Sequence, residues 1–143
     1  MNLSDILKDA SAKWDREVPA NPESIRNLVA ESKIELPEEY LTLLLYSNGG
    51  EGELAIEPGW FQLWPAEKVM EMNRLYEVER NIPGFFGFGS NGGGEMLAFD
   101  TRTGKPWKVV MLPFVPMVAE HSAGIAEDFG VFVQAMGHEF KDS

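Results

Sequence analysis

The glycine-rich run 89–94, with the sequence GSNGGG, is the first candidate for chemistry in this chain. A phosphate-binding P-loop places a lysine and a hydroxyl residue after its last glycine, so that a cation meets the phosphates. Here Glu95 follows instead, with the wrong charge. The next residues also predict a strand, whereas phosphate sites use a helix N-terminus. We therefore interpret the run as a hairpin turn around Asn91 and Gly92.

The two histidines, His121 and His138, lie far apart in the sequence and do not form a local pair of metal ligands. Ser122 stands next to His121, but adjacent residues rarely direct their side chains at each other, and no orienting acid is implied. His138 is expected near the end of a helix, where the helix dipole favours a cation. We predict no catalytic histidine, no metal site and no cofactor.

Two pairs of adjacent carboxylates, at 38–39 and 127–128, resemble acid/base pairs. Both are expected in the first turn of a helix, where a negative charge is stabilising. Neighbouring helical side chains also point about 100° apart, whereas a glycosidase pair must face one substrate. The sequence holds no set of nucleophile, base and orienting group, and we predict that the protein is not an enzyme.

The charge composition argues against a nucleic-acid partner. Asp and Glu number 23 against 12 Lys and Arg, for a formal net charge of −11. Nucleic-acid binding depends on neutralising phosphates with basic groups. In this chain the basic residues are outnumbered by acidic ones. An acidic surface favours solubility, and it also attracts basic protein partners. Both interpretations stay open from composition alone.

A tryptophan-rich segment follows a cluster of carboxylates. If residues 60–64 form a strand, Trp60 and Trp64 share one face with Gln62, while the opposite face is apolar. Either helices cover both faces, or one face binds a partner, because tryptophan is enriched at binding hot spots. We nominate five residues for protein binding: Glu51, Glu53, Glu57, Trp60 and Trp64. Whether the two tryptophans belong to the core or to an interface stays open.

The length of 143 residues fits one domain, which we expect over 1–143. No apolar stretch approaches the ~20 residues of a membrane helix, and the charged N-terminus does not resemble an export signal. The chain has no cysteine, which fits a reducing compartment. We therefore expect a cytoplasmic protein that does not bind a membrane.

Helical spacing dominates the first third of the chain. Apolar residues from Leu3 to Trp14 predict a first helix with Ser4 as N-cap. Asn21 and Pro22 predict the start of a second helix, because proline suits the first helical position. A third helix is expected to begin after Pro37 and to end at the glycines of 47–50.

The later sequence alternates as strands do. We predict strands at 53–57, 60–64, 85–90, 95–100, 107–112 and 115–120, with a helix at 65–79. Ser122 is expected to cap a final helix whose apolar face consists of Ile125, Phe129, Phe132, Val133, Met136 and Phe140. Helices, then strands joined by short turns, then a helix indicate an α+β fold with a curved, mostly antiparallel sheet.

Four blocks in this order resemble the SUKH superfamily, which includes yeast regulators of cell-wall glucan synthesis. The blocks are 36–40 (LPEEY) leading to 48–50 (NGG), 63–67 (LWPAE) leading to Asn73, 88–95 (FGSNGGGE) with Phe99 and Asp100, and 125–129 (IAEDF) leading to Phe132. The resemblance covers about residues 22–140 and leaves 1–21 outside.

The resemblance implies helices around a curved antiparallel sheet and a non-enzymatic role. Bacterial members are mainly immunity proteins that neutralise a cognate toxin of polymorphic or contact-dependent systems, and many such toxins are nucleases or deaminases. It further implies that Gly49, Gly50 and 92–94 serve backbone geometry, and that Asp100 bonds to a turn. The alternatives are a regulatory or scaffold module without a toxin partner and an enzyme acting on a small or cationic substrate.

Overall fold

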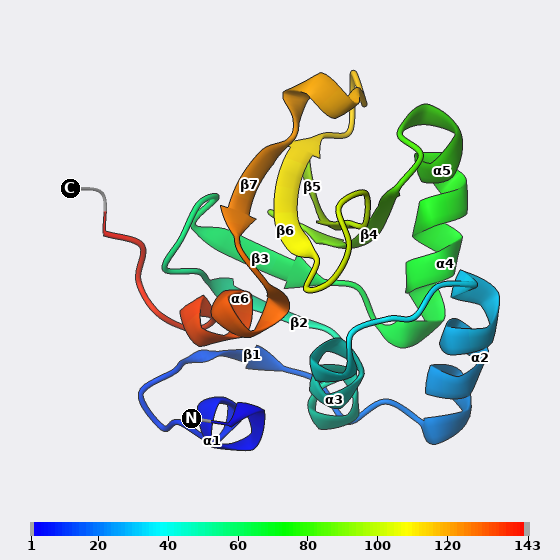
Figure 1. Cartoon of the computed structure of the whole chain (residues 1–143). Coiled ribbons are helices and arrows are strands. Elements are labelled where there is room, and N and C mark those ends of the chain that lie inside the picture. Colours follow the sequence, from blue (N-terminus) through cyan, green and yellow to red (C-terminus); the bar gives the residue numbers. More distant parts are fainter. Residues whose placement is uncertain (1, 142–143) are drawn as a thin grey trace.

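The computed structural model describes residues 2–141, and a single curved sheet runs through this part of the chain (Figure 1). Its seven strands are antiparallel, and each strand pairs with the next one in sequence. They are β1 (Trp14–Arg16), β2 (Gly50–Glu53), β3 (Trp60–Leu63), β4 (Phe85–Ser90), β5 (Glu95–Asp100), β6 (Lys108–Pro113) and β7 (Ala123–Ala126). The predicted α+β fold with an antiparallel sheet is confirmed.

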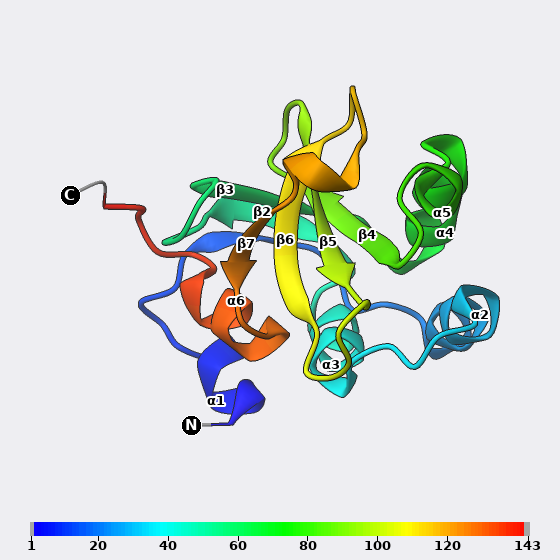
Figure 2. The same cartoon turned by 45° about the horizontal axis from the view of Figure 1, so that its top comes forward.

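Helices flank this sheet (Figure 2), and their buried side chains contribute to the core. They are α1 (Leu3–Leu7), α2 (Pro22–Ser32), α3 (Glu38–Tyr46), α4 (Ala66–Leu75), α5 (Val78–Asn81) and α6 (Phe129–Ala135), with a short 3₁₀ helix, η1, at Ala119–His121. The Asn21 side chain accepts a hydrogen bond from Glu23 N at 2.8 Å, with Pro22 at the first helical position, as predicted. Helix α3 also begins after Pro37, and it ends at Tyr46 with Ser47 as its C-cap, as predicted.

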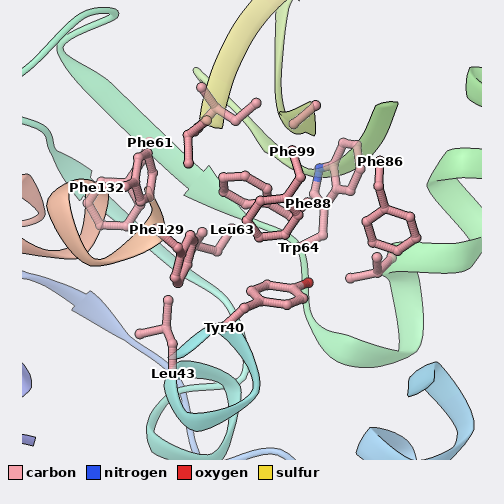
Figure 3. Packing of buried hydrophobic residues seen from close by; sticks show 14 of the residues in the cluster. Tyr40, Leu43, Phe61, Leu63, Trp64, Phe86, Phe88, Phe99, Phe129 and Phe132 are labelled. Atoms are coloured by element: carbon pink, nitrogen blue, oxygen red, sulfur yellow. The ribbon is translucent and has the colours of Figure 1, made fainter. Parts of the chain in front are cut away.

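The core is a cluster of aromatic rings between β3–β5 and the helices α3 and α6 (Figure 3). Phe88 lies at its centre, with ring centroids 4.8 Å from Phe99 and 5.4 Å from Phe132. Phe129 meets Tyr40 edge-on at 5.6 Å, an arrangement that aromatic quadrupoles favour. Residues from four separate segments thereby fix the relative positions of sheet and helices.

Asn73, on α4, extends the edge of β4 beyond the end of β3. The amide of Asn73 donates to the Gly87 carbonyl at 2.9 Å and accepts from the Gly87 N–H at 2.9 Å. Strand β3 ends at Leu63, and Trp64 N makes the next bond along this edge, to Phe88 O at 3.1 Å. One buried side chain therefore takes the place of a strand partner at Gly87.

The first helix is shorter than predicted. It ends at Leu7 and is capped by Asn2 rather than by Ser4, and Trp14 lies in strand β1. Trp14 packs over two glycines of β2, and a Cβ on Gly52 would lie only 2.4 Å from the Cβ of Trp14. The helical spacing of 3–14 was misleading because pairing with β2, a distant segment, determines the conformation of Trp14.

Two predictions for 115–126 are wrong: the strand at 115–120 and the helix start at Ser122. Residues 115–120 were predicted as a strand, but they form a connection that ends in η1. Ser122 is not the N-cap of the final helix: it is the C-cap of η1, its hydroxyl donates to Ala119 O at 2.8 Å, and β7 follows it. Helix α6 starts later, with Asp128 as its N-cap, and ends at Ala135. Ile125 and Phe140 therefore lie outside the helix, and Met136 is its C-cap.

The predicted strands 85–90 and 95–100 coincide with β4 and β5, and 60–64 is one residue longer than β3. The segment 53–57 belongs to strand β2 only at Glu53; Leu54 forms an isolated antiparallel bridge with Met136, and 55–57 form a bend and turn. The segment 107–112 matches β6 within one residue at each end. The region 65–79 divides into α4 and α5, because Glu77 between them adopts a left-handed conformation.

The β4–β5 hairpin has the predicted turn. Asn91 N donates to Glu95 O at 3.0 Å, and the Asn91 side chain accepts from Gly93 N and Glu95 N at 2.9 and 3.1 Å. Gly92 has a φ of 79°, which glycine adopts without strain. The glycine-rich run is thus a turn between strands rather than a loop before a helix.

Candidate functional site

The outward face of β1–β3 carries a row of carboxylates. Strand register places Asp15 opposite Glu51, and Glu51 opposite Gln62. Because side chains alternate along a strand, Glu53 and its partner Trp60 lie on the same face, while Phe61 and Leu63 point into the core. The sheet therefore separates a polar, acidic face from the aromatic core.

Trp60 is exposed and yet held in place. Its side chain is 38% exposed, and its indole N–H donates to the Glu51 carboxylate at 3.2 Å. The ring also lies against Gly92 of the β4–β5 turn. A neighbouring carboxylate and a glycine turn thus fix an aromatic side chain at the surface.

Trp64 differs from Trp60, although the two were predicted on one face of a strand. The chain leaves the sheet after Leu63, and the Trp64 side chain, 6% exposed, packs beside Gly87 and Met96 in the core. Figure 3 shows Trp64 among the core rings. Of the two tryptophans, only Trp60 has an exposed ring.

Glu57 lies in the exposed turn between β2 and β3, close in sequence to Trp60 but outside both strands. Two further carboxylates, Asp15 and Glu17, join this region from the N-terminal segment. Sequence reasoning missed both, because residues 3–14 read as a helix and no local signal indicates that β1 pairs with β2. We define the acidic face as Asp15, Glu17, Glu51, Glu53 and Glu57.

Two shallow depressions border the acidic face. The first, of about 810 Å³, is lined by the segment from Leu7 to Arg16 and by Glu51, Glu53 and Trp60. Three cationic side chains also line it, from Lys8, Lys13 and Arg16. The second, of about 670 Å³, is lined by Asp15, Glu17, Glu51 and neighbouring uncharged residues, with no Lys or Arg. Negative charge is therefore concentrated over the second depression.

The residues considered for catalysis lie apart from one another. His121 is exposed in η1, and His138 is half-buried after α6. Within residues 2–141, no group of three or more His, Asp or Glu side chains is arranged to hold a metal ion. Asp128 is the N-cap of α6 and accepts from Val131 N at 2.8 Å, so it lies just before the first helical turn in which it was expected.

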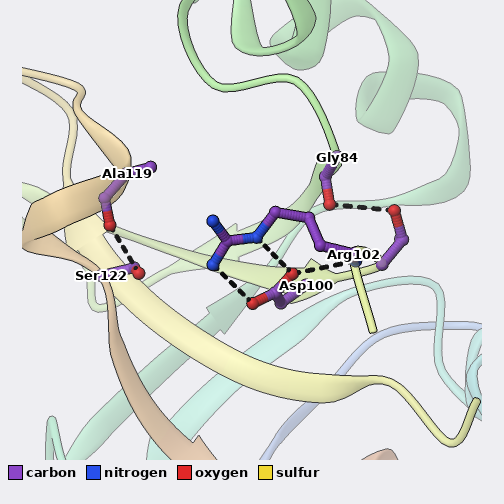
Figure 4. Close-up of polar contacts among 6 residues, drawn as sticks. Gly84, Asp100, Arg102, Ala119 and Ser122 are labelled. Carbon is purple, nitrogen blue, oxygen red and sulfur yellow. Dashed lines mark hydrogen bonds and ion pairs between the residues drawn. The ribbon is translucent and has the colours of Figure 1, made fainter. Parts of the chain in front are cut away.

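Asp100 binds a turn, as the resemblance implied (Figure 4). Its carboxylate accepts from Arg102 N at 3.0 Å and from the Arg102 guanidinium at 2.9 and 3.0 Å. These hydrogen bonds hold the pKa of Asp100 below its ordinary value, although burial opposes the shift. Arg102 also lies over the Phe85 ring at 4.5 Å. The pair fixes the turn that joins β5 to β6.

Fold and surface together define a class: an acidic α+β protein whose sheet presents carboxylates and a fixed tryptophan on one face and an aromatic core on the other. A model of the SMI1 / KNR4 family (SUKH-1) matches residues 19–135, more than half of the chain, and the protein belongs to this family. The match leaves α1 and β1 outside. Its limits are close to the residues 22–140 expected from the sequence. A search of curated proteins returned no match. No helix in the described part of the chain is long and apolar enough to cross a membrane.

Proposed function

We propose that this protein is an immunity protein, which binds a basic protein toxin through the acidic face and Trp60. The observation that carries the proposal is the pairing of uncompensated carboxylates with a fixed, exposed tryptophan on one side of the sheet. Membership of the SMI1 / KNR4 family is consistent with this role.

The electrostatics favour a cationic partner. Asp15 and Glu51 stand opposite each other on neighbouring strands, where like charges destabilise a sheet. None of the ion pairs among the described residues involves a member of the acidic face. Lysine or arginine side chains of a partner would offset this repulsion, and the complex would gain favourable charge pairs that the free protein does not have.

Trp60 has the properties of an anchor residue. Tryptophan side chains contribute strongly to binding when a partner encloses them. Its bond to Glu51 and its contact with Gly92 restrict the ring before binding, so less conformational entropy is lost on association. Carboxylates around a central aromatic ring would give an interface with a charged rim and an apolar centre.

A nuclease or nucleic-acid deaminase fits this surface best among toxin classes. Such an enzyme needs a basic surface to hold phosphates. With a net charge of −11 and a concentrated acidic face, this protein carries the same sign of charge as the nucleic acid that the toxin's basic surface binds. Direct occlusion of the substrate-binding surface would then neutralise the toxin without any chemical step.

The test is the association rate with the toxin after charge reversal of Glu51, Glu53 and Glu57 to Lys. Rim charges mainly set the association rate, so the triple variant should associate at least about tenfold more slowly at low salt, with a weaker dependence on salt. The control reverses Glu23, Glu79 and Glu120, which are exposed on α2, α5 and η1, and changes the net charge equally. Equal association rates for the two triple variants would place the interface elsewhere.

A further inference from the structure

The β5–β6 turn lies beside the start of α3 and the start of α6 (Figure 2). Residues of these three segments line a groove of about 690 Å³. Its apolar lining consists of Leu36, Pro37, Leu41, Pro106, Trp107 and Phe129. None of these residues belongs to the acidic face or to the depressions that border it. The groove has the size of clefts that bind small ligands or a few residues of a peptide.

A cation of the protein itself already lies in this groove. The Lys105 ammonium donates to the Glu35 carboxylate at 2.7 Å and stands 5.1 Å from the centroid of the Trp107 ring. A cation is attracted by the face of a tryptophan ring at this distance. Both partners of the ion pair are exposed, by 43% for Lys105 and 88% for Glu35, so water screens it and a competing cation can replace it.

The rim carries more negative charge than Lys105 neutralises. Four carboxylates line the groove, from Glu35, Glu38, Glu39 and Asp128, against one ammonium group. One oxygen of Asp128 caps α6, and Glu35 holds Lys105. Glu38 and Glu39 are exposed, and neither takes part in an ion pair within the described residues. An apolar floor with this rim complements a segment that is both basic and apolar.

We propose that this groove binds a short segment of a partner protein in which an arginine or lysine stands beside leucine-like side chains. The incoming cation takes the position of Lys105 over Trp107, and the apolar neighbours cover Leu36 and Leu41. Lys105 then acts as a tethered competitor, which weakens binding to segments without a strong cation. This site is separate from the acidic face and does not depend on the toxin-binding role.

The probe is the capped peptide acetyl-Leu-Arg-Leu-amide, titrated into the full chain and followed by ¹H–¹⁵N NMR. We expect saturable shifts of the Trp107 indole and of the Leu36 and Leu41 amides. The neutral peptide acetyl-Leu-Gln-Leu-amide should bind several-fold more weakly. A contact of this size gives roughly millimolar affinity, so the absence of shifts at about 10 mM peptide would overturn the proposal. Equal binding of both peptides would also overturn it.

Two variants test the assigned roles. Glu38→Gln combined with Glu39→Gln should weaken the arginine peptide roughly three- to tenfold, since each exposed ion pair contributes little. The matched control is Glu23→Gln with Glu79→Gln, because these carboxylates also lie in first helical turns and remove the same charge. An equal effect of the two double variants would contradict a local role of the rim.

The third variant, Lys105→Met, keeps the apolar stem of the side chain but removes its charge. Because it vacates the Trp107 ring and frees Glu35, the arginine peptide should bind more tightly, by about two- to fivefold. Unchanged or weaker binding would contradict the role of Lys105 as an internal competitor. All the substituted side chains are exposed, so thermal unfolding should confirm that the fold is intact.

Discussion

Replacing Asn73 with alanine should destabilise the protein far more than most polar-to-alanine substitutions. The change removes both hydrogen bonds between the Asn73 side chain and Gly87. The N–H and the carbonyl of Gly87 then lose these partners in a buried environment. Each unsatisfied buried group costs about 1–3 kcal/mol, so we expect a loss of about 2–6 kcal/mol. That is a large share of the ~5–15 kcal/mol by which domains are stable.

The matched control is Asn48→Ala. Asn48 also bonds to a backbone N–H, accepting from Ala66 at 2.7 Å, and it donates to Glu67 at 2.9 Å. Asn48 is only partly buried, so water can replace it, and losing a cap of this kind costs about 0.5–2 kcal/mol. Urea unfolding measures both losses, and hydrogen exchange at the Gly87 amide reports the site directly. Equal losses for the two variants, or unchanged protection of Gly87, would refute the reasoning.

Three further substitutions test the core and the turn. Tyr40→Phe should leave stability unchanged or raise it by roughly 1 kcal/mol in thermal unfolding, because its buried hydroxyl has no partner within the described residues; a clear loss would indicate one. Asp100→Asn should lose stability at pH 7. The lowered pKa means that wild-type Asp100 stabilises the fold above pH ~4 and loses this contribution as pH falls through its folded pKa, so the difference between the two proteins in urea unfolding should shrink as the pH is lowered below ~4. Trp64→Ala should cost about 3–5 kcal/mol by the same method, whereas Trp60→Ala should cost about 1 kcal/mol or less; the opposite order would contradict their assignment to core and surface.

Local signals predicted the elements that local interactions build. The second helix was found from Asn21 and Pro22 because a cap and a proline act on their immediate neighbours. The β4–β5 hairpin was found from Asn91 and Gly92, whose side-chain bonds and positive φ are needed for the turn itself. Neither prediction required knowledge of the rest of the chain.

Elements that depend on distant pairing were missed. Strand β7 has the sequence AGIA, with few of the β-branched residues typical of strands, and pairing with β6 makes it a strand. Strand β1 exists because Trp14 fits over the glycines of β2. The same limit applies to the candidate site: Glu51 and Trp60 were nominated from composition, but Asp15 joins them only through the sheet.

The core placement of Trp64 was also beyond a local pattern. Alternation along a strand assigns Trp60 and Trp64 to one face, and the alternation holds as far as Leu63. The chain then turns away before Pro65, and Trp64 fills the space beside Gly87. The length of a strand, which packing decides, therefore separates a surface tryptophan from a buried one.

The most direct test of the proposed function is growth rescue. The chain is co-expressed with any toxin domain that a gene beside its own encodes, as wild type and as the two triple charge-reversal variants. We predict that the wild type and the Glu23, Glu79 and Glu120 variant restore growth, while reversal of Glu51, Glu53 and Glu57 lowers rescue with the fold intact. Failure of the folded wild-type protein to protect against any of these toxins would contradict the immunity role, and full rescue by every variant would contradict the role of the acidic face.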